Sequence, residues 1–458
     1  MMNNSKLGKL LFVLSLTMIV SCTAQESAES ETALRSADPE ITFPELAQNM
    51  TIYEVNVRQF TPEGTLQAFS EHLPRLKDLG VEILWFMPIQ PIGELNRKGT
   101  LGSYYSISDY ESVNPEFGNL EDFKSVVQKA HELGLYIILD WVPNHTAWDN
   151  PWMETHREYY QTNEEGEVIY EADWTDIALL DLTNPETRKA MIEAMRFWII
   201  ETDIDGFRCD HAGHEIPLYF WEEAIPQLDQ LKDLFWLAEW DEPKMHLQFD
   251  ATYNWELHHL TNRVARGEEN VDALRDFVLS DLHRYGYNSF RLNFTTNHDE
   301  NAWNGTVFER YGDGHMAYAT FMFTVTGIPM IYSGQEVGMD ERLEFFEKDE
   351  IDWDDPADLQ SFYKSLVSLR KENPALWSGK YGGKLMFYET GNERVIAYTR
   401  IRGSNKVSVL INLSDQPQQV SLDDDFTVST RDYFTGETID DSAGYGLDPF
   451  EYLVFINN

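Results

Sequence analysis

Basic residues are scarce in this sequence. In 458 residues, 35 lysines and arginines stand against 78 aspartates and glutamates, which gives a formal net charge of −43. Such an acidic chain repels nucleic acid and anionic lipid headgroups, so the composition excludes both as ligands and favours a neutral one. Because a solubility or salt adaptation explains the same excess of acid, the charge alone does not identify a substrate.

Long apolar runs are also absent, and none reaches the ~20 residues that a membrane-spanning helix needs. The apolar run at 10–20 is interrupted only by Ser15 and Thr17 and follows Lys6 and Lys9. A short apolar run after a basic start is typical of a signal peptide, which we predict at residues 1–21.

Cysteine is scarce as well: the chain has only two, and Cys22 stands at the end of this apolar run. Ile19-Val20-Ser21-Cys22 resembles a bacterial lipoprotein signal, which would make Cys22 the lipidated first residue of an exported, membrane-anchored protein. Simple secretion with cleavage near Ala24 is the alternative. Either way Cys209 is the last cysteine left to the folded part, so no intramolecular disulfide is expected. Residues 22–40 are rich in Ser, Glu and Ala and predict a flexible tether.

Strand and helix patterns alternate along the middle of the chain. Apolar residues recur at helical spacing over 66–79 and 123–133, each run ending just before a glycine. Thr183-Asn184-Pro185-Glu186 predicts the start of another helix. Strands are predicted at 51–57, 81–87, 135–141, 204–207, 234–237, 249–253, 290–295 and 328–332.

Eight strands alternating with helices predict a (β/α)8 barrel at 41–380, with a small domain B inserted at about 145–182, after the third strand. A doubly wound open sheet is the main alternative, but no glycine-rich phosphate loop follows the first strand. Beyond residue 380 the pattern changes to short alternating strands, which predict a C-terminal all-β sandwich at 381–458. Its strands are expected at 384–388, 395–400, 406–412, 418–422 and 452–456.

The fourth predicted strand leads into Arg208-Cys209-Asp210. Alternation places Arg208 and Asp210 on the same side of an extended backbone, where the guanidinium favours the ionised form of the carboxylate. An ordinary ion pair is the simpler interpretation of an isolated pair of this kind. An ionised aspartate at a strand end can also act as a nucleophile, so the other strand ends decide between the two.

Catalytic residues of such barrels lie at the C-terminal ends of the strands. Three further predicted strands also end in polar motifs, and no Cys/His metal spacing or serine-centred elbow competes with them. Four strands that all end in polar motifs are improbable by chance, so we predict that these motifs form one active site at the barrel mouth. The motifs are Asp140-Trp141-Val142-Pro143-Asn144-His145, Ala238-Glu239-Trp240 and Thr296-Asn297-His298-Asp299.

Paired carboxylates without a redox or phosphate motif indicate glycoside hydrolysis, and carboxyls on adjacent strands suit the retaining route, which needs a separation of about 5–5.5 Å. Asp210, beside Arg208, is expected to be the ionised partner. Glu239, between Ala238 and Trp240, is expected in an apolar setting that favours the protonated form and the acid role.

The four motifs resemble, in order, the signature regions of the α-amylase family of retaining α-glycosidases, glycoside hydrolase family 13. Gly102 to Tyr110 is similar to the segment that supplies the family's stacking tyrosine. The resemblance runs from about residue 50 to the end of the chain. It implies a hydrolase of α-1,4-glucans or maltodextrins that needs no cofactor. It implies these roles: Asp210 nucleophile, Glu239 general acid/base, Asp299 transition-state stabiliser, His145, Arg208 and His298 hydrogen-bonding to the sugar, and Tyr105 stacking on it.

The sequence departs from the family after the nucleophile. Many relatives have Lys-His at the positions of Gly213 and His214, so a lysine contact on the leaving-group side is missing here. Asn144, Asp181 and His214 match positions of the family's calcium site, but the same residues occur in calcium-free relatives. Calcium is therefore possible and is not predicted.

Two other functions stay open. A transglycosylase or isomerase acting on maltose, trehalose or sucrose would use the same site, because only the fate of the covalent intermediate differs. A non-catalytic glucan-binding protein is the third option, but a pure binder has no need of Asp210, Glu239 and Asp299 together.

Overall fold

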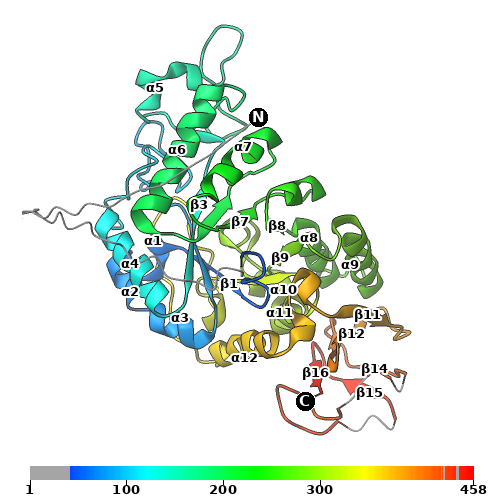
Figure 1. Cartoon of the computed structure of the whole chain (residues 1–458). Coiled ribbons are helices and arrows are strands. Elements are labelled where there is room, and N and C mark those ends of the chain that lie inside the picture. The colour runs from blue at the N-terminus through cyan, green and yellow to red at the C-terminus, as the bar shows by residue number, and fades with distance from the viewer. Residues whose placement is uncertain (1–41, 424, 427–428, 440–442, 458) are drawn as a thin grey trace, which may run out of the picture. The chain divides into compact units, whose positions relative to one another are not determined.

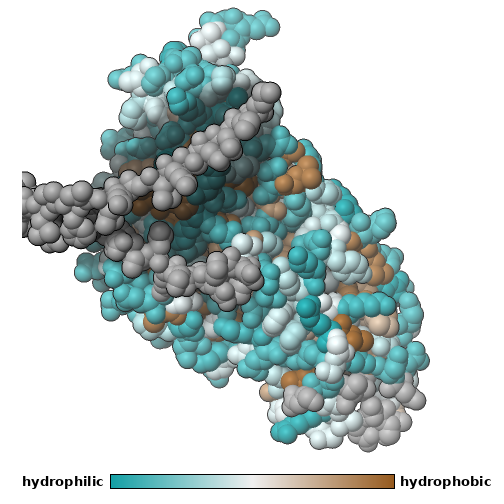
Figure 2. All heavy atoms as spheres, in the orientation of Figure 1, coloured by the Kyte–Doolittle hydropathy of each residue, from teal (hydrophilic) through white to brown (hydrophobic). Residues whose placement is uncertain are grey.

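The computed structural model describes residues 42–423, 425–426, 429–439 and 443–457. The predicted signal peptide at 1–21 and tether at 22–40, with Cys22, lie outside these residues. None of the helices in the described part is long and apolar enough to cross a membrane. On the face shown in Figure 2 hydrophilic side chains dominate and hydrophobic ones form small patches, as the acidic composition leads one to expect.

Eight parallel strands form a closed barrel in the order β1-β10-β9-β8-β7-β6-β3-β2. The barrel closes where β1 pairs in parallel with both β10 and β2. Figure 1 shows these strands surrounded by helices, which confirms the predicted (β/α)8 architecture. The strands are β1 Ile52–Val55, β2 Ile83–Phe86, β3 Tyr136–Trp141, β6 Gly206–Cys209, β7 Phe235–Ala238, β8 Ala251–Tyr253, β9 Phe290–Asn293 and β10 Ile328–Tyr332.

Apolar faces of the outer helices pack against the strands in a large buried core. The predicted helix at 66–79 is two helices, α2 and α3, with a break at Glu71–His72. Pro74 explains the break, because proline has no N–H for a continuing helix but is tolerated in a first turn. The helices around the barrel are α1 Val57–Phe60, α2 Leu66–Ser70, α3 Leu73–Leu79, α4 Leu120–Glu132, α6 Pro185–Thr202, α7 Leu218–Leu228, α8 Trp255–Ala265, α9 Val271–Tyr285, α10 Val307–Tyr311, α11 His315–Thr324 and α12 Leu359–Glu372.

The segment between β3 and α6 contains the predicted insertion. It includes α5 Trp152–Thr155 and a two-stranded antiparallel sheet of β4 His145–Ala147 and β5 Ile177–Leu179. This sheet starts directly after β3, so His145 is carried by the insertion and not by the barrel itself. The insertion thus stands next to the C-terminal ends of the barrel strands.

The C-terminal strands form two antiparallel sheets, as predicted. The four-stranded sheet buries alternate residues on its two faces: Val395 and Ala397 pack with residues of the small sheet, whereas Ile396 and Tyr398 pack with residues of α11. One strand of the small sheet, β15, was not predicted from the sequence, because it has only three residues. The sheets consist of β11 Lys384–Tyr388, β12 Val395–Arg402, β13 Asn405–Asn412 and β16 Tyr452–Ile456, and of β14 Gln418–Val420 with β15 Tyr445–Leu447.

The strand that carries Arg208 lies two residues later than predicted. We expected it at 204–207, but β6 covers Gly206–Cys209 because its pairing with β3 continues through Asp140 opposite Arg208. At the start of β6, Gly206 leaves no room for a side chain: a Cβ there would lie 2.0 Å from the backbone oxygen of Phe235. The close approach of β6 and β7 therefore depends on this glycine.

Replacing Gly206 by alanine should destabilise the protein by about 1–3 kcal/mol or more, the usual cost of overpacking. The added methyl group meets backbone atoms of β7, a strand fixed between β6 and β8. Gly446→Ala is the control, since the atom found near its Cβ position is the flexible side-chain oxygen of Gln419 at 3.2 Å. Melting temperatures measured side by side test this, and an unchanged value for Gly206→Ala contradicts it.

Candidate active site

Side chains that point into the barrel change from apolar to charged along the strands. Because side chains two residues apart share a face of a strand, the barrel interior continues directly into the mouth at the C-terminal ends. Isoleucines and a leucine fill the interior, and each is followed two residues later by an ionisable side chain. The pairs are Ile52 and Glu54, Ile138 and Asp140, and Leu237 and Glu239.

Arg208 lies at the centre of this mouth and is fully buried. Its Nη1 donates hydrogen bonds to Asp140 Oδ1 at 3.1 Å and to Asp210 Oδ1 at 2.8 Å. Its Nε donates to the hydroxyl of Tyr253, and its guanidinium carbon lies 4.8 Å from the centre of the Trp85 ring. The predicted contact between Arg208 and Asp210 is confirmed, and it leaves Asp210 Oδ2 outside that bond.

The expected apolar setting of Glu239 is wrong. Its Oε2 accepts the backbone N–H of His211 at 2.9 Å, and its Oε1 lies 2.9 Å from Arg208 Nη2. The approach to Arg208 is not aligned as a hydrogen bond, since Nη2 has no hydrogen-bond partner among the described residues. The flanking residues Ala238 and Trp240 gave no sign of these contacts, because they come from another strand and its following turn.

The chain turns back on itself directly after Asp210. His211 has a φ of +47°, a left-handed conformation that is unfavourable for a side-chain-bearing residue. This turn brings the His211 N–H to Glu239, so the strain is located between the two carboxylates. His211 was not recognised as a site residue from the sequence, because a single histidine after Asp210 forms no pattern.

His298 connects Tyr105, Asp299 and Glu54. Its Nε2 lies 2.8 Å from the hydroxyl of Tyr105 and 3.2 Å from Asp299 Oδ2. Its Nδ1 lies 2.5 Å from Glu54 Oε1. The Tyr105 hydroxyl also donates to Asp140 Oδ2 at 3.0 Å, which links this group to Arg208. Glu54 was missed because strand one ends in no recognisable motif.

The charges of these groups follow from burial and neighbours. Burial lowers the pKa of His298, but Asp299 and Glu54 outweigh it and raise the pKa to about 9. His298 is therefore protonated at neutral pH, when both ring nitrogens are donors. Burial, aided by His211, lowers the pKa of His145 to about 3, so His145 is neutral.

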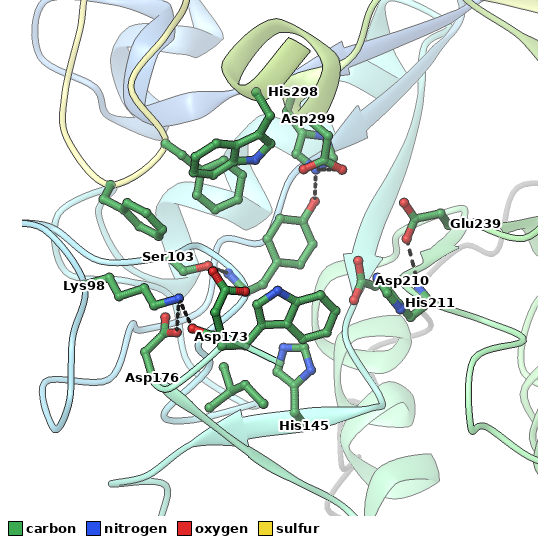
Figure 3. Close-up of a pocket in the computed structure, with 16 residues that line it drawn as sticks. Lys98, Ser103, His145, Asp173, Asp176, Asp210, His211, Glu239, His298 and Asp299 are labelled. Atoms are coloured by element: carbon green, nitrogen blue, oxygen red, sulfur yellow. Dashed lines mark hydrogen bonds and ion pairs between the residues drawn. The ribbon is translucent and has the colours of Figure 1, made fainter. Parts of the chain in front are cut away.

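A pocket of about 610 Å³ opens between the barrel mouth and domain B and holds all but one of the predicted site residues. In Figure 3, Asp210 and Glu239 lie on one side of it and Lys98 and Asp176 at the other. Arg208 does not line the pocket, but it contacts Asp210, which does. The predicted residues that line the pocket are Tyr105, His145, Asp210, Glu239, His298 and Asp299.

Loops contribute most of the lining that the sequence analysis missed. Lys98, from the loop after β2, donates to the Asp173 backbone oxygen at 2.6 Å and lies 3.6 Å from Asp176 of domain B. Aromatic rings line the rest of the pocket, and no periodic pattern marks them in the sequence. They are Trp174, Trp303, Phe345 and Phe346.

A second, more open pocket of about 450 Å³ adjoins the first. The two share His211, Glu239 and Asp299, whereas Asp210 lines only the first. The rest of the second pocket is formed by Trp240, Asp241, Glu242 and Trp255.

The residues matched to a calcium site have other contacts. Asp181 accepts hydrogen bonds from the backbone N–H and hydroxyl of Thr183, and His214 Nε2 lies 2.7 Å from Glu171. Across the described ranges, no group of three or more His, Cys, Asp or Glu is arranged to hold a metal ion.

Two carboxyl groups beside one buried guanidinium, at the mouth of a (β/α)8 barrel with a pocket of sugar size, define a glycoside hydrolase. The comparisons agree: residues 29–171 and 163–383 match the Alpha-amylase family model, described as the alpha amylase catalytic domain. The chain belongs to the alpha-amylase family.

Individual relatives are similar over most of the chain. The structure of a noncanonic maltogenic alpha-amylase, AmyB from Thermotoga neapolitana, is 30% identical with a TM-score of 0.81, covering 90% of this chain and 99% of that one. Alpha-amylase 2 of Dictyoglomus thermophilum is 27% identical over 84% of this chain and 69% of its own length. An alpha-1,4-glucan:maltose-1-phosphate maltosyltransferase of Salinibacter ruber is 28% identical over 81% of this chain, which spans only 60% of that protein.

Glu54→Gln should reduce kcat/KM about 10- to 100-fold, as expected for loss of a charged hydrogen bond worth about 1.5–3 kcal/mol. The pKa of His298 is raised from 6.5 to about 9, so its stabilising contribution is complete below pH 6.5 and is lost as the pH rises through about 9. The difference in melting temperature between wild type and Glu54→Gln should therefore shrink over that window.

The exposed Glu63→Gln serves as the matched control and should behave as wild type. A melting-temperature difference for Glu54→Gln that stays constant from pH 6.5 to 9 would show that Glu54 does not hold the proton on His298.

Proposed function

We propose that the protein is a retaining hydrolase that cleaves α-1,4-linked glucans or maltodextrins through a covalent glycosyl ester on Asp210. One observation carries this proposal: Arg208 holds Asp210 through Nη1 and approaches Glu239 through Nη2. A single guanidinium therefore keeps the two carboxyl groups side by side, as the retaining route requires.

The first step uses the free oxygen of Asp210. Oδ1 stays bonded to Arg208, and Oδ2 attacks the anomeric carbon from the side opposite the leaving group. The bond to the glycosidic oxygen breaks as the ester forms. In the second step water attacks the same carbon, the ester breaks, and the α-configuration is restored.

Glu239 supplies and then removes a proton. Oε2 is held by the His211 N–H, while Oε1 has only the poorly aligned approach of Arg208. Oε1 is therefore the atom that we assign to carry the proton to the leaving oxygen. After the leaving group departs, the same oxygen takes a proton from the attacking water.

The other predicted residues orient the sugar. Protonated His298 and neutral His145 line the pocket and can hydrogen-bond to hydroxyl groups, and Asp299 lies beside His298. Tyr105 lies parallel to the His298 ring, with ring centres 5.4 Å apart, and presents an aromatic face suited to the apolar face of a glucose ring. No cofactor takes part in this chemistry.

Transfer to a sugar acceptor is the second candidate, favoured by the likeness to a maltosyltransferase. Only the group that attacks the ester differs, so the products decide. Incubation with starch, maltotriose, cyclodextrin, pullulan and sucrose separates the two: hydrolysis gives shorter sugars only, and transfer also gives longer or isomerised ones.

Asp210→Asn should fold, still bind maltooligosaccharide, and lose several orders of magnitude in turnover, because it keeps the volume but removes the nucleophilic charge. Wild-type enzyme should first release the α-anomer, which NMR can follow. If Asp210 only paired with Arg208, the variant would have a lowered melting temperature and nearly normal activity. That result, or a β-anomer as first product, contradicts the mechanism.

We further propose that the protein is exported and attached to a membrane by lipid on Cys22. The support is the basic start, the apolar run at 10–20 and the Ile19-Val20-Ser21-Cys22 sequence that ends it. One acyl chain binds a membrane only marginally, so stable attachment requires more than one.

Cys22→Ser expressed in a Gram-negative host should move from the membrane fraction to the soluble one. Cys209→Ser is the control, since the Cys209 thiol is buried in β6 and should not affect attachment. If Cys22→Ser stays with the membrane after a salt wash, Cys22 is not the anchor.

A further inference from the structure

A short segment borders the active-site pocket at the end opposite the two catalytic carboxyl groups (Figure 3). Residues 93–102, which we call the strap, belong to the loop between β2 and α4. Lys98 of the strap lines the pocket, together with Asp173 and Asp176 of domain B. Phe346, from the loop after β10, lines it as well. Three segments that lie far apart in the sequence therefore meet at this end.

Lys98 joins the strap to domain B. Its Nζ donates a hydrogen bond to the backbone oxygen of Asp173 at 2.6 Å and lies 3.6 Å from Asp176 Oδ1. Asp149 of domain B adds a second link, because its Oδ2 accepts the backbone N–H groups of two consecutive strap residues at 2.6 and 3.1 Å. Asp149 is exposed and does not line the pocket. The gap between the strap and domain B is therefore bridged at two places.

The other side of the strap is fixed to the loop after β10. The backbone N–H of Leu101 donates to the backbone oxygen of Phe346 at 3.0 Å. The backbone N–H of Thr100 donates to Glu347 Oε1 at 2.7 Å. Gly99 permits this close packing, since a Cβ at residue 99 would lie 2.5 Å from Phe346 Cβ. The strap thus forms a continuous wall from domain B to the β10 loop.

Arginine side chains hold the strap in one conformation. Arg97 donates from Nε to the backbone oxygen of Gly93 at 2.7 Å and from Nη2 to that of Ile92 at 3.0 Å. The buried Arg58 donates from Nη1 to the backbone oxygen of Gly102 at 3.1 Å. A glucan chain cannot displace the strap without breaking several of these hydrogen bonds, each of which costs free energy.

The strap stands on the glycone side of the cleavage point. This step rests on the proposed function, in which Glu239 protonates the leaving oxygen. Glu239 also borders the second pocket, which Asp210 does not line, so the leaving part of the chain extends in that direction. The part that becomes attached to Asp210 extends the other way, toward Lys98 (Figure 3).

We propose that the strap limits the glycone side of the pocket to a short oligosaccharide, so that the enzyme cleaves glucans from their non-reducing ends and releases a product of fixed length. The non-reducing end is concerned because the sugar attached to Asp210 carries that part of the chain. A pocket of about 610 Å³ suits a ligand of drug size, which for a glucan means a few sugar rings. An interior stretch of a long chain would have to continue through the strap.

A blocked chain end tests the wall in the wild-type enzyme. Maltoheptaose and its 4,6-O-ethylidene derivative differ only by a small group on the last sugar of the non-reducing end. We expect kcat/KM on the blocked sugar to be at least about tenfold lower, because the added bulk meets a fixed wall. Unblocked maltotetraose, maltopentaose, maltohexaose and maltoheptaose should all give the same first product from that end, which chromatography can show.

Lys98→Ala should admit longer chains, since it removes both contacts of Nζ with domain B. The ratio of kcat/KM on blocked to free maltoheptaose should rise about threefold or more, and longer products should appear. Lys124→Ala is the matched control and should change the ratio less than about twofold. The Lys124 side chain is 29% exposed against 26% for Lys98 and pairs with Glu121 and Glu201, but it lies outside the pocket.

Asp149→Ala separates the wall from a direct sugar contact of Lys98. It releases two hydrogen bonds of the strap without removing any group that lines the pocket, so the same ratio should rise. If Lys98 acted only by binding sugar, Asp149→Ala would leave the ratio unchanged, and that result refutes the role of the strap. Melting temperatures of both variants verify that they are folded.

Equal kcat/KM of the wild type on blocked and free maltoheptaose would overturn the proposal. A Lys98→Ala enzyme that loses activity on both sugars to the same extent would overturn it as well. A wild-type enzyme that is inactive on both sugars would instead refute the proposed function, so the two failures are distinguishable.

Discussion

The buried guanidinium of Arg208 is the interaction on which the site depends. It is surrounded by carboxyl groups and aromatic rings, with no exposed side-chain surface. A charge in such a place costs several kcal/mol unless it is paired, and the pairing is mutual. Burial raises the pKa of Asp140 to about 7 against the opposing effect of Arg208. Without Arg208, Asp140 would keep its proton and Asp210 would lose its orienting partner.

The barrel and the charged residues of its mouth could be predicted because both follow from the period of two along each strand. Apolar residues at alternate positions mark the barrel interior, and the polar residue that ends each run marks the mouth. Asp210, Glu239 and His298 were found because each stands in a polar motif at or just after the end of a predicted strand. Glu54 follows the same rule, but one carboxylate after a strand is too common to be noticed without its partner His298.

The features of the site that could not be predicted from the sequence are contacts between segments that lie far apart in the chain. The surroundings of Glu239 were wrongly predicted because the polar groups around it belong to β6 and the turn after it. The ring of Trp240 over Gly213 joins two segments that are unrelated in sequence pattern. The loops that complete the pocket have no periodicity, so Lys98 and Phe345 could not be assigned to it beforehand.

The excess of carboxyl groups at the mouth has a consequence for the reaction itself. A neutral sugar gains little from a negative surrounding field. When the glycosidic bond breaks, however, the sugar ring becomes an oxocarbenium-like cation, and the same field stabilises it. The field thus acts on the transition state far more than on the bound substrate, which is the condition for raising kcat. The groups concerned are Glu54, Asp140, Asp210 and Asp299, against Arg208 and His298.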